Sequence, residues 1–217
     1  TRTAVGEHLM LGGDNMDLAL AHGLEPQFAG EGQRLPAARF AQLVQRCRLA
    51  KEQLLAANAP ESVAVTLLGG GSQLLAQTRS ATLTRDAVRQ AVVEGFLPPA
   101  QITDQPARRQ GALRTLSLPY PADAAISRHL ALFLAQHAAG ELPDTLLLNG
   151  GVFRAGPIAE RLETTLAHWR GAPLRVLHND APDLAVARGA VAWGLARTRG
   201  SGPAIGGAIV TGACDVL

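Results

Sequence analysis

Apolar residues recur at helical spacing in several stretches of the chain. The longest apolar stripe lies within residues 37–57 and consists of Phe40, Leu43, Val44, Cys47, Ala50 and Leu54. Intervals of three and four residues place these side chains on one face, so we expect an amphipathic helix packed against a core. Comparable patterns predict helices at residues 16–22, 85–94, 158–169 and 184–197, and one that follows Asp123, which can cap it.

Capping residues and glycines predict where these helices begin and end. Asp14 or Asn15 can cap the first helix, and Gly23 is expected to end it. Thr84 is a suitable cap for the helix at 85–94, because its hydroxyl can accept from a free N–H of the first turn. Gly95 is expected to end that helix.

Short runs bounded by glycine or polar residues predict the strands. Residues 62–68 and 73–80 flank the triple glycine at 69–71, an arrangement typical of a hairpin. Residues 145–148 and 174–177 are apolar-rich runs of four, long enough for short buried strands and too short to be helices.

Strand and helix alternate in the last third of the chain. This alternation favours an α/β layered subdomain, which we assign to residues 1–11, expected as a short strand, together with 121–200. Residues 12–120 contain helices and the hairpin and are expected to form an inserted α+β subdomain. The glycine-rich residues 201–217 are expected to be a loosely held tail. Because the chain opens at Thr1 on what resembles the interior of a domain, we expect a piece of a longer protein.

Composition and charge exclude several classes of function. The 217 residues are 47% apolar and 18% charged, an ordinary balance for a globular protein that buries a core. The net charge of +2 is too small to predict a nucleic-acid or membrane partner. Cys47 and Cys214 are far apart and match no metal-ligand spacing, which favours a reducing, cytoplasmic compartment. No apolar run has the length of a membrane span, and no secretory signal opens the chain.

The strongest candidate for chemistry is the glycine pair after the predicted strand at 145–148. Gly150 and Gly151 follow that strand, and Pro157 stands where the next helix begins. A strand, a glycine turn and a helix expose backbone amides beside a gap without side chains, which allows a main chain to approach a nucleotide. A plain turn has the same pattern, so the glycines alone leave both interpretations open.

Three other groups of residues have simpler structural interpretations. The triple glycine at 69–71 is followed by neither a lysine nor a helix, so it predicts a turn rather than a phosphate loop. His129 and His137 lie beside an apolar helical stripe, and neither has a second ligand at metal-binding spacing. The proline-rich connection at 96–122 contains arginines that are expected to form a solvated rim: Arg108, Arg109 and Arg114.

Four stretches, in this order, resemble the second lobe of the actin-like ATPase domain in DnaK-type 70-kDa heat-shock chaperones. Residues 11–17 (Leu-Gly-Gly-Asp-Asn-Met-Asp) resemble the family's Leu-Gly-Gly-Glu-Asp-Phe-Asp. Residues 46–54 (Arg-Cys-Arg-Leu-Ala-Lys-Glu-Gln-Leu) resemble its Cys-Glu-Arg-Ala-Lys-Arg-Thr-Leu helix. Residues 149–154 (Asn-Gly-Gly-Val-Phe-Arg) are similar to the adenosine motif Val-Gly-Gly-Ser-Thr-Arg, and residues 181–190 (Ala-Pro-Asp-Leu-Ala-Val-Ala-Arg-Gly-Ala) resemble Asn-Pro-Asp-Glu-Ala-Val-Ala-Tyr-Gly-Ala.

The resemblance covers the chain up to about Arg197 and implies a fold and a function. The implied fold is an α/β lobe of the actin-like ATPase (ribonuclease H-like) class with an inserted α+β subdomain. The implied ligands are ATP or ADP with magnesium, bound between two lobes of the full-length protein. The implied partners are the nucleotide, the first ATPase lobe of the same chain, client proteins and cochaperones. Departures from the motifs point to a distant DnaK-related branch.

The adenosine motif implies roles for its glycines and its arginine. Gly150 and Gly151 match the glycine pair, the second of which lies against the nucleoside in the family. Arg154 matches the arginine that stacks on the base, and a planar, weakly hydrated guanidinium suits an aromatic ring. Phe153 could add to this stacking or could be a core side chain.

The remaining implied site residues come from the other motifs. Lys51 matches a family lysine near the ribose and base. Arg48 stands where the family has a glutamate and Glu52 where it has an arginine, an exchange that either preserves the hydrogen-bonding set or abolishes the ribose contacts. An ion pair between these two residues on one helix face is the structural alternative. Gly13 matches a glycine near the sugar, and Asp183 matches an acidic residue that equally suits the positive end of a helix.

The phosphate-binding half of the family's site has no counterpart in the sequence. Phosphoryl transfer depends on groups from both lobes, so we expect no ATPase activity and no bound cofactor from this piece alone. The first hypothesis is therefore the adenosine-binding lobe of a DnaK-like ATPase. The alternative is a non-catalytic protein-interaction module on an actin-like scaffold, and a sugar or acetate kinase of the same superfamily is a third hypothesis.

Overall fold

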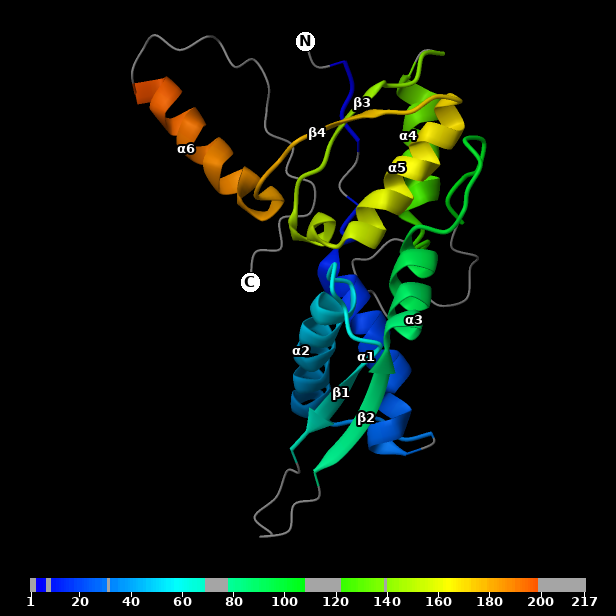
Figure 1. The fold of residues 1–217 in the computed structure, drawn as a ribbon, viewed down its shortest axis with the longest axis vertical. Helices are drawn as coiled ribbons and strands as arrows, with labels where there is room; N and C mark the ends of the chain where they lie inside the picture. The colour runs from blue at the N-terminus through cyan, green and yellow to red at the C-terminus, as the bar shows by residue number, and fades with distance from the viewer. Residues whose placement is uncertain are drawn as a thin grey trace. The chain divides into compact units, whose positions relative to one another are not determined.

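A computed structural model describes residues 3–6, 9–30, 32–68, 78–107, 122–138 and 140–198 (Figure 1). Within these ranges helices predominate, and the strands form two sheets of two strands each. The elements are, in order, α1 (Gly13–Ala29), α2 (Ala37–Leu54), β1 (Ser62–Leu67), β2 (Arg79–Thr84), α3 (Arg85–Val88), α4 (Ile126–His137), β3 (Thr145–Leu147), α5 (Gly156–Arg170), β4 (Arg175–Leu177) and α6 (Ala185–Thr198). The mixed α/β class was expected from the sequence and is confirmed, as is the expected order of helices and strands after residue 11.

The described residues cluster into two compact units. The first, here called the hairpin unit, comprises residues 12–98 and 155–161. The second, here called the strand–helix unit, comprises the described residues of 1–11, 99–154 and 162–217. The expected layered subdomain and its insertion at 12–120 stay a prediction, because part of the connection that would bound the insertion lies outside the described residues.

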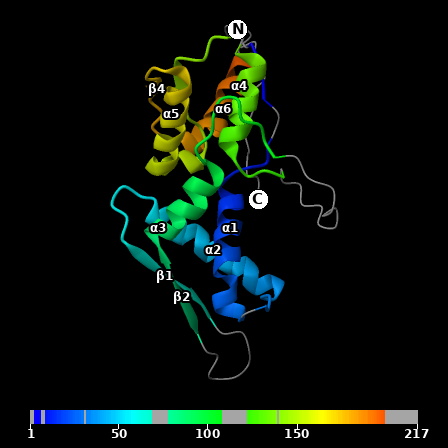
Figure 2. The same ribbon diagram turned by 90° about the vertical axis from the view of Figure 1, so that its right-hand side faces the viewer.

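In the hairpin unit, α1 and α2 pack against each other and against the antiparallel pair β1–β2 (Figures 1 and 2). The register places Ser62 opposite Thr84 and Leu67 opposite Arg79. Alternate side chains of a strand point to opposite faces, so one face of this hairpin is apolar and the other is rich in Ser and Thr. On the apolar face Val63 is half-buried, and the following side chains are buried: Val65, Leu67, Ala81 and Leu83.

The stripe predicted for α2 forms part of the core of the hairpin unit. Four of its members are buried: Leu43, Cys47, Ala50 and Leu54. Burial of this kind contributes about 1.5–3 kcal/mol for each large aliphatic side chain. Burial also raises the pKa of the Cys47 thiol to about 12. This cysteine therefore stays protonated and acts as a small apolar side chain.

α1 differs from its prediction at both ends. The Asn15 side chain accepts a hydrogen bond from the backbone N–H of Gly12 at 2.8 Å, so it satisfies the helix start from within the first turn instead of capping it. Gly23 does not end the helix. That prediction was wrong because Leu24 and Phe28 are buried and continue the apolar face, which outweighs a glycine cost of about 1 kcal/mol.

The second strand of the hairpin and the helix after it also differ from their predictions. The strand was expected at 73–80 and is found at β2, whereas residues 69–77, with the triple glycine, lie outside the described residues. Thr84 is confirmed as a cap, since its hydroxyl accepts from the backbone N–H three residues later at 3.2 Å. After α3 the chain continues as a π-helix (Arg89–Glu94), and Gly95 is still helical, so the predicted α-helix end was wrong.

In the strand–helix unit, β3 and β4 pair in parallel, and α5 connects them along the chain (Figure 1). The prediction that these strands are buried was wrong: Leu147 is 51% exposed and every residue of β4 is exposed, because the described helices of this unit leave both strands largely uncovered. The buried apolar side chains of this unit come from α4, α5 and the segments beside them: Ala125, Ala131, Leu134, Leu162, Leu166 and Leu174. The indole N–H of Trp169 donates to the carbonyl oxygen of Ala100 at 2.7 Å. This bond ties α5 to the start of the connection between the two predicted subdomains.

The strand expected within residues 1–11 is not found in the described part of that range. Met10 has a backbone φ of 49°, in the left-handed region. A residue in that region interrupts the extended conformation that a strand requires.

The last predicted helix is confirmed as α6, preceded by a 3-10 turn (Pro182–Leu184). Its large apolar side chains are exposed within this unit, among them Val191, Trp193 and Leu195. The Arg197 guanidinium lies 5.4 Å from the centre of the Trp193 ring, a cation–π geometry. Within the described ranges, no helix combines the length and the apolar character that crossing a bilayer would require.

Asp123 holds the entry to α4 without capping it as predicted, because that helix begins only at Ile126. One carboxylate oxygen accepts from the N–H of Ala125 at 2.9 Å, and the other accepts from the N–H of Ala107 and from Arg128, both at 2.8 Å. Burial alone would raise the pKa of Asp123, but these hydrogen bonds outweigh burial and hold the pKa below its usual range.

We expect Asp123→Asn to lower the free energy of unfolding by about 2 kcal/mol at pH 7, because buried donors lose a charged acceptor. The folded pKa lies below the unfolded value of about 3.9. The contribution of the carboxylate is therefore present above that value and is lost as the pH falls through the folded pKa. Urea unfolding at pH 7 and pH 3 should show the difference between the two proteins shrinking in acid.

The exposed Asp86 in α3 provides a control for this prediction. Asp86→Asn removes a charge of the same kind and should change stability by no more than about 0.5 kcal/mol. An Asp123→Asn effect of equal size at both pH values would contradict the assignment.

Candidate functional site

The parallel pairing of β3 and β4 positions the candidate nucleotide-binding residues of the strand–helix unit. The register places Leu147 opposite Leu177, the last residue of each strand. Strands that run in the same direction end at the same edge, so the loops at 148–154 and 178–184 meet there. In α/β proteins this carboxyl edge is where ligands commonly bind.

The glycine pair forms the turn that leaves β3. Gly150 has a backbone φ of 102°, where a side chain would introduce strain. Its N–H donates to the carbonyl oxygen of Pro182 at 2.7 Å, and its own carbonyl accepts from the N–H of Phe153 at 3.2 Å. Gly151 opens the 3-10 turn Gly151–Arg154 and is exposed, and a Cβ there would meet only Asp183, at an ordinary 4.0 Å. The backbone therefore requires glycine at 150 but not at 151.

The Arg154 guanidinium is held by a carboxylate from the loop after β4. Its Nη1 atom lies 3.3 Å from Oδ2 of Asp183, with the two side chains 70% and 38% exposed. An ion pair this exposed adds only about 0–1 kcal/mol to stability. Its effect is therefore to orient the guanidinium while leaving it accessible.

Asn149 and Asn179 join the same two loops and were not singled out by the sequence. The Asn179 amide donates to the carbonyl oxygen of Leu148 at 3.0 Å and to the side-chain oxygen of Asn149 at 2.7 Å. Its own oxygen accepts from the N–H of Ala181 at 3.3 Å. Each asparagine stands two residues after the end of its observed strand, but the predicted strands at 145–148 and 174–177 placed the two at unequal offsets, so the sequence held no signal for this pair.

The hairpin unit contains the other four predicted site residues, and Lys51 is the best defined of them. Its ammonium group lies 2.7 Å from Oδ1 of Asp17 and donates to the carbonyl oxygen of Gly13 at 3.2 Å. Lys51 is 9% exposed and Asp17 2% exposed. Burial raises the pKa of Asp17, and the adjacent ammonium opposes that shift. Lys51 therefore binds α2 to the start of α1, which brings it together with Gly13.

Arg48 and Glu52 form an exposed ion pair on α2. The guanidinium Nε lies 3.4 Å from Oε1 of Glu52, and Nη1 lies 4.0 Å from Asp14. This is the geometry of the i, i+4 pair that the sequence offered as the structural alternative, worth about 0.2–0.5 kcal/mol. The charges of Arg48 and Glu52 thus satisfy each other in this structure.

The predicted residues gather into two groups, one in each unit. The group in the strand–helix unit consists of Gly150, Gly151, Arg154 and Asp183, and the group in the hairpin unit consists of Gly13, Arg48, Lys51 and Glu52. Within each group, residues from separate motifs contact one another: Arg154 with Asp183, and Lys51 with Gly13.

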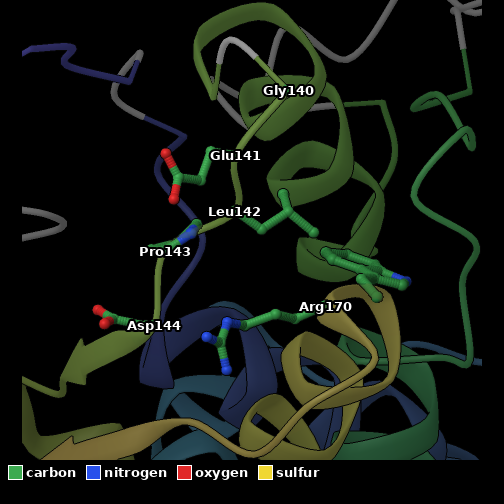
Figure 3. Close-up of a pocket in the computed structure, with 7 residues that line it drawn as sticks. Gly140, Glu141, Leu142, Pro143, Asp144 and Arg170 are labelled. Atoms are coloured by element: carbon green, nitrogen blue, oxygen red, sulfur yellow. The ribbon is translucent and has the colours of Figure 1, made fainter.

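A hollow of about 670 Å³ lies elsewhere in the strand–helix unit (Figure 3). It is lined by Gly140–Asp144 before β3 and by Trp169 and Arg170 at the end of α5. Figure 3 shows the Leu142 side chain directed towards the α5 end of the hollow. The Arg170 guanidinium donates to the carbonyl oxygen of Pro173 at 2.7 Å. None of the predicted nucleotide-binding residues lines this hollow.

The histidines and the arginine-rich connection, which the sequence also offered as candidates, contribute little to the described site. In the part of the chain that the structure describes, no His, Cys, Asp or Glu residues cluster in a way that could hold a metal ion. The Nε2 atom of His129 lies 3.0 Å from the carbonyl oxygen of Asp123. The arginines at 108, 109 and 114 and the tail at 201–217 lie outside the described residues.

Comparison of the sequence with models of known protein families and with curated proteins finds no match. The functional argument therefore depends on the resemblance of the motifs and on the geometry of the residues that form them.

The role of Lys51 in the fold predicts a specific stability pattern. We expect Lys51→Met to lower the free energy of unfolding by about 3 kcal/mol, because Asp17 then stays buried without its counter-charge. Adding Asp17→Asn to that variant should restore most of the loss. Arg48→Met, on the exposed face of α2, should cost no more than about 0.5 kcal/mol. Urea unfolding of the unaltered protein and the three variants measures these changes in the free energy of unfolding. Equal losses in Lys51→Met and Arg48→Met would contradict the structural role of Lys51.

Proposed function

We propose that this chain is the adenosine-binding second lobe of a DnaK-like chaperone ATPase with the actin-like fold. In the full-length protein it would bind ATP or ADP with magnesium together with the first lobe, and it would not be catalytic alone. The other partners proposed from the resemblance are client proteins and cochaperones. The protein is proposed to act in the cytoplasm.

The observation that carries this proposal is the exposed glycine turn at the carboxyl edge of the parallel pair β3–β4. Gly151 presents backbone without a side chain, and Arg154 stands one short turn later with its guanidinium exposed. An adenine ring can stack on a guanidinium held in this way, because both groups are planar. The carboxylate of Asp183 would keep the guanidinium oriented for that contact.

The roles proposed for Gly13, Arg48, Lys51 and Glu52 depend on the resemblance alone. The carbonyl oxygen of Gly13 and the ammonium group of Lys51 already contact each other, and Arg48 pairs with Glu52. Of these four residues, Arg48 and Glu52 are the two with exposed side chains, so they are the ones open to ribose hydroxyls. Any sugar recognition by this unit is therefore assigned to those two side chains.

A second candidate function is a non-catalytic protein-interaction module on the same scaffold. It is favoured by the burial of Lys51, because the ammonium group is paired with Asp17 and holds α1 against α2. It is also favoured by the mutual pairing of Arg48 and Glu52. This candidate predicts a folded protein without measurable affinity for adenosine.

Titration of the full-length protein with adenosine separates these candidates. We expect binding that Arg154→Ala weakens by about 10-fold, because stacking on the guanidinium is lost. Arg154→Lys should also weaken binding, since an ammonium group keeps the charge but not the planar surface. Isothermal titration calorimetry measures both effects.

The exposed Arg89 offers a matched control for this titration. Arg89→Ala removes the same side chain outside the proposed site and should leave the affinity within about twofold. Absence of a thermal shift and of phosphate release with millimolar magnesium-ATP would reject the ATPase proposal. An unchanged affinity in Arg154→Ala would contradict the stacking role of Arg154, and a folded protein without measurable affinity for adenosine would favour the interaction module.

A further inference from the structure

We propose that Asn179 is the positioning residue that holds the glycine turn after β3 in the shape that receives a nucleoside. This inference rests on the proposed function and adds a residue to it. Asn179 is half-buried and lies in the loop after β4, beside the turn after β3 that it would hold.

The three hydrogen bonds of Asn179 use one consistent orientation of its amide. Nδ2 donates to the carbonyl oxygen of Leu148 and to Oδ1 of Asn149, both in the loop after β3. Oδ1 accepts from the N–H of Ala181 in its own loop. A side-chain amide has two donor hydrogens on nitrogen and acceptor sites on oxygen, so these bonds can form together. One side chain thus links both loops.

A fourth hydrogen bond transmits this link to the glycine pair. The bond between Asn179 and the N–H of Ala181 forms an Asx turn, which directs the chain into Pro182. The Pro182 carbonyl oxygen then accepts from the N–H of Gly150 at 2.7 Å. Asn179 therefore acts on both sides of Gly150: at Leu148 and Asn149 before it, and at its amide through Pro182.

The three hydrogen bonds of Asn179 and the bond between Gly150 and Pro182 are here called the clasp. The clasp also determines how the proposed base-stacking pair is placed. Asp183 directly follows Pro182, and Arg154 closes the turn that Gly151 opens. The 3.3 Å ion pair between Arg154 and Asp183 requires the two loops to keep their mutual register. Opening the clasp would separate these side chains without disturbing the buried core, because the pair itself is exposed.

The pair of asparagines allows a charge-matched test. Asn179→Asp keeps the acceptor for Ala181 but removes both donors and places a carboxylate against two oxygens. Asn149→Asp adds the same charge at the other end of the hydrogen bond between the two asparagines, but it keeps an acceptor for the Asn179 amide. Each substitution preserves the size of the side chain, so packing is the same in both variants.

The experiment measures two quantities in the full-length protein: adenosine affinity by calorimetry and exchange of the Gly150 amide hydrogen by NMR. For Asn179→Asp we expect Gly150 exchange to accelerate by about 10-fold and adenosine to bind about 10-fold more weakly. For Asn149→Asp we expect exchange close to that of the unaltered protein and a loss of affinity below about threefold. The melting temperature should shift little in either variant, because the clasp is largely exposed.

Each outcome bears on a different claim. Unchanged Gly150 exchange in Asn179→Asp overturns the clasp, and faster exchange with unchanged affinity overturns its positioning role. Equal losses in the two variants also overturn the inference, because charge alone then explains them. Failure of the unaltered protein to bind adenosine overturns the proposed function itself, and the exchange measurement still decides whether Asn179 closes the turn. If Asn179→Asp does not fold, Asn179→Ala removes both donors and the acceptor without adding charge, and unchanged Gly150 exchange in that variant overturns the clasp.

Discussion

The hydrogen-bonded parallel pairing of β3 with β4 is the constraint on which the candidate site depends. Three residue pairs, ending with Leu147 and Leu177, fix both the direction and the register of the loops that follow. Positions equally far beyond the strands therefore meet, as Asn149 and Asn179 do. A slip of one residue would move every side chain of one strand to the other face. It would also withdraw Gly150 from its hydrogen-bond partner, so two short strands govern a much longer stretch of irregular backbone.

Two ion pairs, one in each unit, differ in how far they are buried. In the hairpin unit, Lys51 and Asp17 are buried and their pairing is part of the packing of two helices. A buried pair of this kind costs desolvation and stabilises mainly by preventing an uncompensated charge. In the strand–helix unit, Arg154 and Asp183 stay exposed, so little folding free energy depends on them. Residues of the second kind can exchange a protein partner for a ligand at small cost, which makes them the better candidates for binding.

The sequence predicted the elements better than it predicted the contacts between them. Periodicity located the buried face of α2, and short apolar runs located β3 and β4, because these signals are local. The prediction that Gly23 ends α1 was wrong, since the burial of Leu24 beyond it is a tertiary effect that helix propensity does not include. The ion pair of Lys51 and the bonds of Asn179 join segments that are distant in sequence. The equal offset of the two asparagines from their strands follows only from the observed strand ends, because the first strand was predicted one residue too long.

The two adjacent glycines, Gly150 and Gly151, are required for different reasons. Gly150 has a positive φ, so folding alone excludes almost every other residue there. Gly151 has ordinary space around the direction in which a Cβ would point. A randomised library sorted only for folded protein should keep glycine at the first position and drift towards alanine or serine at the second. A library sorted for ligand binding should keep both glycines. Retention of glycine at position 151 therefore reports whether a ligand binds against that backbone.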